Sequence, residues 1–421
     1  MALHPDSIRR ILIALIEQAQ SDLQKKGLIR KDQAISPLVF GTSANEIDAF
    51  AVDEATLGFD SLSRLELISS VNRFFQLSQT GAEDYLLLNP SIGRWVETVS
   101  QHATLVDEGQ TYGFATSGTA GPVSIHLHPL QRLEAEVDAL RTGPLNGFAC
   151  PSRIIALVPP HHIFGFLFTC LLPSMIGADV IDLHRHAPSA LARMGQPGDL
   201  VIGTPFSWQS VAAAGMAISR GLHGITSGGP STDETWLRQG PGRPEKMTEI
   251  YGATETGGIG SRQAQEAPFS LLEHLAAVDS DIVRAADADQ ASLPIQDRIV
   301  WTADRQFRLG GRFDQVVQVA GVNVLPAQVA ACIGEVTGVA DVAVRPGNDR
   351  LKGFVVAKRE VEDLQALEVK IRDHVRMRLP APARPGTLTF GAALPRNVMG
   401  KPCDWAEPEE TRSADVPYVA S

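Results

Sequence analysis

Residues 114–128, with the sequence FATSGTAGPVSIHLH, are the stretch around which the rest of the chain can be organised. A β-like entry runs into a turn of serine, threonine and glycine and leaves as a second strand. Glycines let the backbone approach an anion closely, and hydroxyl and free N–H groups can bind phosphate oxygens. A single loop of this kind is also typical of a plain surface turn, so its meaning depends on the motifs downstream.

The composition describes an ordinary globular protein with room for more than one domain. The chain has 421 residues, of which 44% are hydrophobic, and a formal net charge of −11. This length allows about two to four domains. The acidic balance argues against nucleic acid as a partner, and no apolar run is long enough to span a membrane. The cysteines form no CxxC pair and no signal peptide is evident, so the cytoplasm is the expected location.

The first hundred residues are predicted to be helical. Apolar side chains recur on one face of residues 7–23, and a second helix is predicted to run to Phe75. Asp60 or Ser61 can cap this second helix. A last short helix is predicted within residues 85–99, and a polar bridge over 101–110 separates this region from the rest.

The segment Gly58-Phe59-Asp60-Ser61-Leu62 resembles the attachment motif of acyl and peptidyl carrier proteins. The resemblance implies a carrier-like helical domain over residues 1–100 and a 4′-phosphopantetheine arm on Ser61, added by a phosphopantetheinyl transferase. A serine at an exposed helix N-terminus suits the charge of a phosphodiester. The alternative is that Asp60 and Ser61 only cap the helix.

Residues 110–311 are predicted to form an α/β domain. Apolar runs at 153–158, 180–183 and 200–203 indicate buried strands, and helical patterns lie between and beyond them. This alternation favours a largely parallel sheet, in which ligands bind beyond the carboxyl ends of the strands. Two motifs fit that position: the small-residue turn 224–230 and the segment Ile250–Gly258, where Glu255 suits a Mg²⁺ ion between phosphates.

Taken in order, these motifs resemble those of the adenylate-forming superfamily of acyl-CoA and aryl-CoA ligases, luciferases and peptide-synthetase adenylation domains. The family's Thr-Ser-Gly-Thr-Thr-Gly loop is matched by residues 116–121, its histidine motif by His162–Gly165, and its Tyr-Gly-x-Thr-Glu motif by Tyr251–Glu255. The resemblance implies ATP and Mg²⁺ as cofactors, Glu255 as the Mg²⁺ ligand, and His162 beside the carboxylate pocket. The implied nucleotide contacts are Thr116, Ser117, Gly118, Thr119, Gly121, Gly228, Gly229, Pro230, Tyr251, Gly252 and Thr254.

The same resemblance continues to the C-terminus. Asp304, in Trp-Thr-Ala-Asp, implies a ribose-binding carboxylate, although its spacing to Gly311 is short. Arg312 and Asp314 match the Gly-Arg-x-Asp hinge, which is followed by a small mobile α+β lid over 312–405. Residues 395–401 match the family's Pro-x-x-x-x-Gly-Lys loop, and this resemblance implies that Lys401 is the catalytic lysine. An ammonium group suits the role because it can hold a carboxylate and an α-phosphate together. Residues 406–421 are predicted to be a disordered tail.

The sequence departs from the family in two places. The phosphate loop of the family usually ends in Pro-Lys, whereas Pro122 is followed here by Val123. The segment before that loop is short, so either the α/β domain is trimmed or the carrier assignment is wrong. His126 and His128 share a strand face, but no third ligand is evident nearby, which argues against a metal site.

The predicted function is ATP-dependent activation of a small carboxylic acid, followed by transfer to the phosphopantetheine thiol on Ser61 and use by a downstream thioester enzyme. One alternative is an acyl-CoA ligase with a structural N-terminal region and CoA as the thiol. Another is a non-catalytic docking protein of the same fold. Phe164, Phe166, Phe206 and Trp208 indicate either an aromatic substrate pocket or ordinary core.

Overall fold

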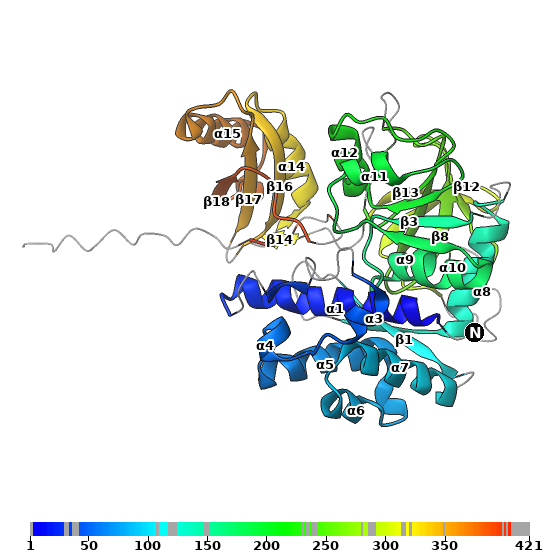
Figure 1. The fold of residues 1–421 in the computed structure, drawn as a ribbon. Coiled ribbons are helices and arrows are strands. Elements are labelled where there is room, and N and C mark those ends of the chain that lie inside the picture. The colour runs from blue at the N-terminus through cyan, green and yellow to red at the C-terminus, as the bar shows by residue number, and fades with distance from the viewer. Residues whose placement is uncertain are drawn as a thin grey trace, which may run out of the picture. The chain divides into compact units, whose positions relative to one another are not determined.

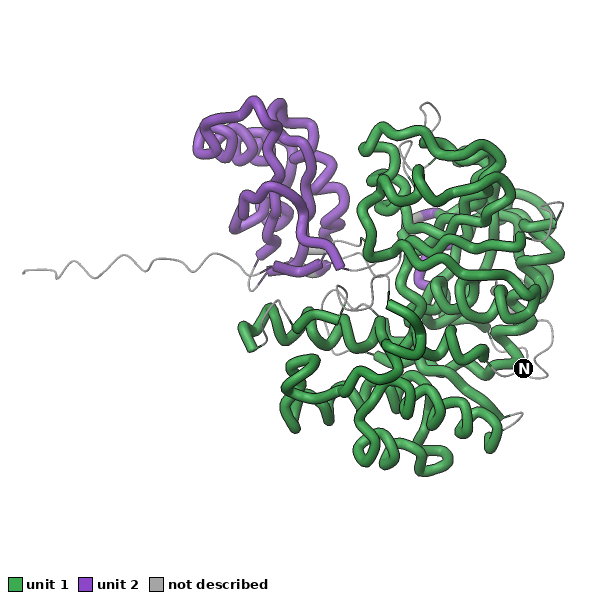
Figure 2. The backbone as a smooth tube through the Cα atoms, viewed as in Figure 1, with its two compact units in different colours: residues 1–295, 299–309, 398–401 green, residues 296–298, 310–397, 402–421 purple. Residues whose placement is uncertain are grey.

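The computed structural model divides the chain into two compact units (Figure 2). The first takes residues 1–295, 299–309 and 398–401, and the second takes 296–298, 310–397 and 402–421. The structure describes residues 3–28, 33–35, 42–106, 109–116, 124–146, 151–229, 231, 236, 242–278, 281–284, 292–312, 317–319, 322–347, 350–397, 400 and 403–405.

Helices form the beginning of the first unit, as the sequence predicts (Figure 1). They are α1 (Pro5–Lys25), α3 (Ala44–Asp48), α4 (Glu54–Leu57), α5 (Ser61–Phe75), α6 (Glu83–Leu88) and α7 (Ile92–Val106), with the 3-10 turn η2 (Leu77–Gln79). Helix α1 packs against α5 and α7. Asp60 caps α5, since its carboxylate accepts the Ser63 N–H at 2.8 Å.

These helices share one hydrophobic core with the α/β part of the unit. A single cluster of buried side chains extends from Leu3 through the helices to Leu272. Phe74 of α5 links the two parts, because its ring centroid lies 5.4 Å from that of Phe114 and 5.9 Å from that of Phe166. Such edge-to-face pairs stabilise the core beyond the burial of their area. The predicted boundary at 101–110 therefore does not separate two cores.

Polar contacts join α1 to the same body. The Arg10 guanidinium donates hydrogen bonds to the Thr169 carbonyl at 2.7 Å and to the Thr169 hydroxyl at 3.1 Å. Further along the helix, Glu17 forms an ion pair with Arg185. Losing one partner of a largely buried pair is costly, since the other charge is left without compensation. The N-terminal helices are thus a structural layer of the first unit.

A nine-stranded sheet, counted over the described residues, runs through the α/β part in the order β12-β13-β9-β8-β7-β6-β5-β3-β4. Neighbours among β3 to β7 are parallel, whereas β8 runs antiparallel to β7. The strands are β3 (Arg153–Ala156), β4 (Asp179–Asp182), β5 (Leu200–Gly203), β6 (His223–Thr226), β7 (Lys246–Ala253), β8 (Gly257–Arg262), β9 (Phe269–Leu271), β12 (Asp297–Ala303) and β13 (Gln306–Arg312).

Smaller elements complete this part. Hairpins are formed by β1 (Thr111–Ala115) with β2 (Ile125–Pro129) and by β10 (Leu275–Val278) with β11 (Asp281–Arg284). The helices are α8 (Leu130–Thr142), α9 (Ile163–Phe166), α10 (Leu172–Ile176), α11 (Ser189–Met194) and α12 (Pro205–Ala213), with the π-helical turn η4 (Leu167–Leu171) between α9 and α10.

The second unit has its own core of buried aliphatic side chains. Its elements are the hairpin β14 (Val317–Val319) and β15 (Val322–Val324), the sheet β16 (Val339–Pro346), β17 (Leu351–Ala357) and β18 (Thr387–Gly391), the helices α14 (Pro326–Gly334) and α15 (Leu364–Arg378), and the turn η6 (Ala381–Ala383). The predicted fold class is confirmed: a helical N-terminal part, a large α/β sheet and a small α+β unit.

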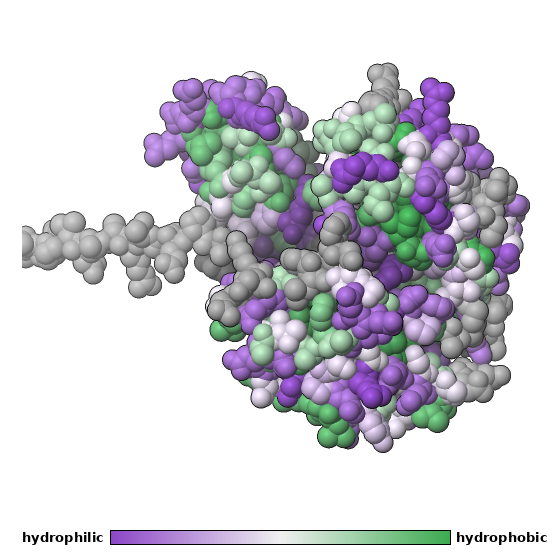
Figure 3. All heavy atoms as spheres, in the orientation of Figure 1, coloured by the Kyte–Doolittle hydropathy of each residue, from purple (hydrophilic) through white to green (hydrophobic). Residues whose placement is uncertain are grey.

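Polar and apolar residues are interspersed over the face of the first unit in Figure 3. None of the helices in the described ranges is both long enough and apolar enough to cross a membrane.

Replacing Phe74 by alanine is expected to destabilise the first unit by about 3–5 kcal/mol, because it leaves a cavity between the helical layer and the α/β part. Leu65, on the same helix, is 48% exposed, so Leu65→Ala serves as the control and should cost less than about 1 kcal/mol. Urea unfolding of both variants measures the difference. Equal costs would contradict the shared core.

Candidate active site

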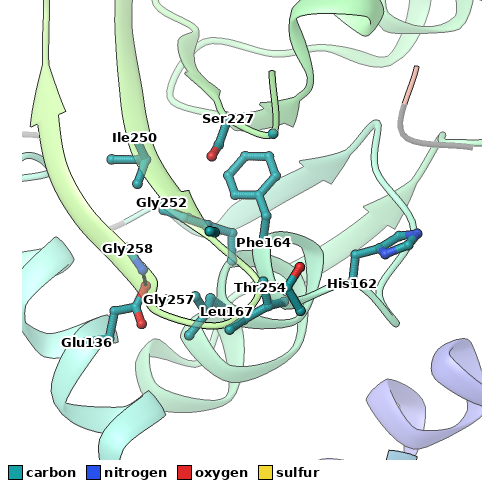
Figure 4. Close-up of a pocket in the computed structure, with 14 residues that line it drawn as sticks. Glu136, His162, Phe164, Leu167, Ser227, Ile250, Gly252, Thr254, Gly257 and Gly258 are labelled. Atoms are coloured by element: carbon teal, nitrogen blue, oxygen red, sulfur yellow. Dashed lines mark hydrogen bonds between the residues drawn. The ribbon is translucent and has the colours of Figure 1, made fainter. Parts of the chain in front are cut away.

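Three segments that are far apart in the sequence meet at one pocket of the first unit (Figure 4). Ser227 and Gly228 follow β6, Gly252 and Ala253 end β7 with Thr254 after it, and His162 begins the segment that enters α9. Strands β6 and β7 are parallel neighbours, so their carboxyl ends lie at the same edge of the sheet. The space within the pocket, counted together with the open solvent at its mouth, is about 630 Å³.

The β1–β2 hairpin carries the phosphate-loop motif and contacts the Tyr251–Glu255 motif at the end of β7. Its base is closed by the Thr116 N–H, which donates to the Ser124 carbonyl at 2.9 Å. On β2, His128 Nε2 lies 2.7 Å from the Thr254 carbonyl oxygen. Burial lowers the pKa of His128 to about 4, so the ring is neutral at physiological pH and donates its Nε2–H to that carbonyl. Residues 117–121 of the loop lie outside the described residues.

A buried carboxyl group that the sequence analysis did not identify lines the pocket. Glu136, on α8, is 4% exposed, and its Oε1 accepts a hydrogen bond from the Gly258 N–H at 2.6 Å. Burial raises the pKa of Glu136 to about 8, against the opposing effects of the Gly258 N–H and of Arg284. Position 136 adjoins the apolar stripe of α8 in the sequence, so a glutamate there was a signal that could have been noticed.

We expect Glu136 to make the stability of the protein depend on pH. Its folded-state pKa lies above the ordinary value of 4.5, so the folded protein holds the proton more tightly than the unfolded chain. The free energy of unfolding should therefore fall as the pH rises from about 5 to about 8, by up to about 1.4 kcal/mol per pH unit. In Glu136→Gln this contribution is absent. Urea unfolding at pH 5, 6.5 and 8 checks it, and parallel pH profiles would contradict the raised pKa.

The other predicted residues of the β7 motif have different environments. Tyr251 packs its ring against Phe269 and Phe307, with centroids 5.6 and 5.8 Å away. Gly252 and Thr254 line the pocket. Glu255 lies in the turn after β7 and is partly buried, where its carboxylate suits a Mg²⁺ ion carried by phosphates. No group of three or more metal-ligating side chains occurs within the described ranges.

Among the described residues, Asp304 and Gly229 are not in the lining of this pocket. Asp304 is exposed at the turn between β12 and β13. Arg312 ends β13, and Gly229 follows Gly228 at the end of the β6 turn. Pro230, Asp314 and Lys401 lie outside the described residues, as does the predicted tail over 406–421.

Ser61 is exposed in the first turn of α5, and its neighbour Asp60 acts as the N-cap. This arrangement is that of an ordinary helix start. The helix is anchored in the shared core through Phe74. The structural role that the sequence analysis left open for this region is therefore the one that the packing supports.

Comparison with known proteins places the chain in a family. Residues 328–401 match the model of the AMP-binding enzyme C-terminal domain. The chain is 38% identical over 401 residues to a 4-coumarate–CoA ligase of Cereibacter sphaeroides, an alignment that covers 95% of this chain and 96% of that protein. It is 42% identical over 357 residues to a 4-coumarate–CoA ligase of Rhodobacter capsulatus, covering 84% and 91%.

Solved structures share the fold. The anthranilate–CoA ligase AuaEII with anthranoyl-AMP has a TM-score of 0.53 at 18% identity, over 75% of this chain and 69% of that chain. ATP-bound MatB from Rhodopseudomonas palustris has a TM-score of 0.56 at 16% identity, over 92% and 90%. Since the Cereibacter alignment includes most of the first hundred residues, the short segment before the phosphate loop is common to both proteins. The chain therefore belongs to the adenylate-forming family of AMP-binding acid–thiol ligases.

Proposed function

We propose that this protein joins a hydroxycinnamic acid of the 4-coumarate type to CoA. The observation that carries the proposal is the 38% identity to a 4-coumarate–CoA ligase over 95% of the chain. The pocket supports it, since aromatic and aliphatic side chains from α9 and η4 (Phe164, Leu167 and Phe168) line it beside glycines. Flat apolar walls and unhindered backbone suit a planar aryl acid.

The reaction has two steps. A carboxylate oxygen of the acid attacks the α-phosphorus of ATP. The bond from this phosphorus to the oxygen that bridges the α- and β-phosphates breaks, and pyrophosphate leaves with that oxygen. The CoA thiol, losing its proton, then attacks the acyl carbon, and AMP leaves. Lys401 holds the two anions of the first step together and neutralises the charge that develops. Glu255 holds the Mg²⁺ ion, which supplies positive charge to the phosphates when bound.

The remaining roles follow from the family motifs that these residues match. The backbone of Ser227 and Gly228 lines the adenine; Gly228 has φ +90°, which lets its chain turn without a side chain. Thr116, Thr254 and residues 117–121 of the phosphate loop contact the phosphates of ATP. His162 flanks the carboxylate of the acid. The second unit, reached through Asp314, acts as the lid between the two steps.

For the ribose, the hairpin geometry favours Asp297 over Asp304. Asp304 is at the turn of the β12–β13 hairpin, whereas Asp297 begins β12 and Arg312 ends β13. Asp297 and Arg312 thus share the end opposite the turn. Six residues of extended strand separate the two aspartates, a distance of about 20 Å. Of the two aspartates, Asp297 is therefore the nearer to Arg312, and it is the one proposed to hold the ribose.

CoA, rather than a carrier-bound arm on Ser61, is the proposed thiol. Most of the first hundred residues align with a protein named as a CoA ligase, and their buried side chains belong to the core of the first unit. The cytoplasm, where ATP and CoA are available, remains the expected location.

Acid-dependent exchange of pyrophosphate into ATP, and CoA-dependent thioester formation, test the proposal. We expect both with 4-hydroxycinnamic acid, and Ser61→Ala should keep wild-type rates. Exchange that gives no thioester with CoA, or thioester that depends on Ser61, would overturn the choice of thiol. Exchange with other acids but with no cinnamic acid would overturn the substrate class.

A further inference from the structure

A single acidic side chain lines the apolar part of the pocket. Among the described residues that form the lining, Glu136 is the only one with a carboxyl group. Its side chain is more than nine-tenths buried. Burying a carboxyl group is costly unless it is hydrogen-bonded, so a glutamate at this position calls for a role.

The glycine pair Gly257-Gly258 leaves space for this carboxyl group. A Cβ atom at Gly257 would lie 2.3 Å from Glu136 Oε2, and one at Gly258 would lie 2.6 Å from Oε1. Any larger residue at either position would displace the carboxyl group. Gly257 also has φ +77°, a backbone conformation that glycine adopts without strain. The turn therefore both fixes and accommodates Glu136.

Only one of the two carboxyl oxygens of Glu136 accepts a hydrogen bond from a described residue. Oε1 accepts the Gly258 N–H at 2.6 Å. Oε2 makes no hydrogen bond with any described residue. Figure 4 shows Glu136 beside Gly257 and Gly258, with His162 on the other side of the view. A ligand whose carboxylate lies near His162 would thus have its opposite end toward Glu136.

We propose that Glu136 determines substrate specificity by hydrogen-bonding, through Oε2, a ring hydroxyl at the end of the acid opposite its carboxylate. This inference rests on the proposed function and names the group of the substrate that the site selects. The raised pKa of Glu136, about 8, favours a protonated carboxyl group at neutral pH. Oε1 then accepts from Gly258 while the Oε2–H donates to the hydroxyl oxygen of the substrate.

The proposal predicts strong discrimination against an acid that lacks the hydroxyl. Such an acid would leave Oε2 buried against an apolar ring without a partner, which costs more than the loss of an exposed hydrogen bond. We expect wild-type kcat/KM for 4-hydroxycinnamate to exceed that for cinnamate, and for 4-methylcinnamate, by at least about tenfold. The methyl group has nearly the size of the hydroxyl but cannot form the hydrogen bond.

The experiment measures thioester formation with these three acids in the wild type, Glu136→Leu, Glu136→Gln and Glu134→Leu. The ratio of kcat/KM values is independent of the fraction of active enzyme. We expect Glu136→Leu to lose the preference, and Glu136→Gln to keep most of it, since its amide can donate to the hydroxyl and accept from Gly258. Glu134 is on the same helix but not in the pocket lining, so Glu134→Leu should leave the ratio unchanged.

The outcomes separate this inference from the proposed function. A preference that survives in Glu136→Leu, or equal use of all three acids by the wild type, overturns the role of Glu136 and leaves the proposed function standing. Turnover of none of the three acids, by an enzyme that activates another acid, overturns both. If Glu136→Leu does not fold, the wild-type comparison with 4-methylcinnamate still decides, because an equal rate would contradict the hydrogen bond.

Discussion

Replacing Lys401 by alanine is expected to slow adenylate formation by about a hundred- to a thousandfold. The step brings a carboxylate against a phosphate and develops further negative charge, and one positioned donor of positive charge typically contributes that much. Lys401 is the last residue of the segment that matches the AMP-binding C-terminal domain. The measurement is acid-dependent pyrophosphate exchange, with binding of ATP measured separately to show that the site still forms.

Lys358, an exposed lysine of the second unit, provides the control. Lys358→Ala removes an equal charge from the second unit and should leave the exchange rate within about twofold of the wild type, because a solvated surface charge contributes little. A rate for Lys401→Ala close to that of Lys358→Ala would show that the lysine has no part in the chemistry.

Replacing Gly252 by alanine is expected to destabilise the first unit by about 3 kcal/mol and to lower the adenylation rate by at least about a hundredfold. The added Cβ would lie 2.3 Å from the Gly257 carbonyl oxygen and 2.9 Å from the Gly258 Cα. Both are backbone atoms of the turn and the strand next to β7, so no side-chain rotation relieves the contact. The shift would move Thr254 and the glycines that hold Glu136.

Gly242→Ala is the matched control. Its Cβ would meet its nearest neighbour, the Val211 carbonyl oxygen, at 3.4 Å, an ordinary contact, in the same unit. We expect a change in the free energy of unfolding below about 1 kcal/mol and an unaltered rate. Urea unfolding and pyrophosphate exchange compare the pair. If both variants behaved alike, the close packing of the β7 turn would not be what shapes the pocket.

The sequence predicted the parts of the fold that local patterns determine. The parallel strands β3, β4 and β5 follow from their apolar runs, and the helices α1 and α5 follow from their periodicity and from the Asp60 cap. Residues 224–226, predicted as part of a turn, belong instead to strand β6. The order of the motifs also predicted that the histidine segment, the Ser227 turn and the end of β7 belong to one site, and the pocket brings these three together.

What the sequence could not supply were contacts between distant segments. The Gly-x-Asp-Ser-Leu pattern at Ser61 is compatible with a carrier domain and with a helix cap, and only the packing of Phe74 on Phe114 and Phe166 tells them apart. Glu136 was overlooked because its role depends on Gly258, which lies 122 residues away. Asp304 was predicted from the resemblance of Trp-Thr-Ala-Asp to a family motif, and the sequence alone did not show that this aspartate lies at a hairpin turn, with Asp297 and Arg312 at the other end of the two strands.

The most direct test is a crystal structure of the protein with a non-hydrolysable sulfamate analogue of 4-hydroxycinnamoyl-AMP. We expect the adenine beside Ser227 and Gly228, the aryl ring against Phe164 and the ring hydroxyl within hydrogen-bonding distance of Glu136 Oε2. An analogue bound in a different cavity, or with its aryl ring outside the pocket lined by Phe164 and Gly257, would contradict the assignment of this pocket as the active site.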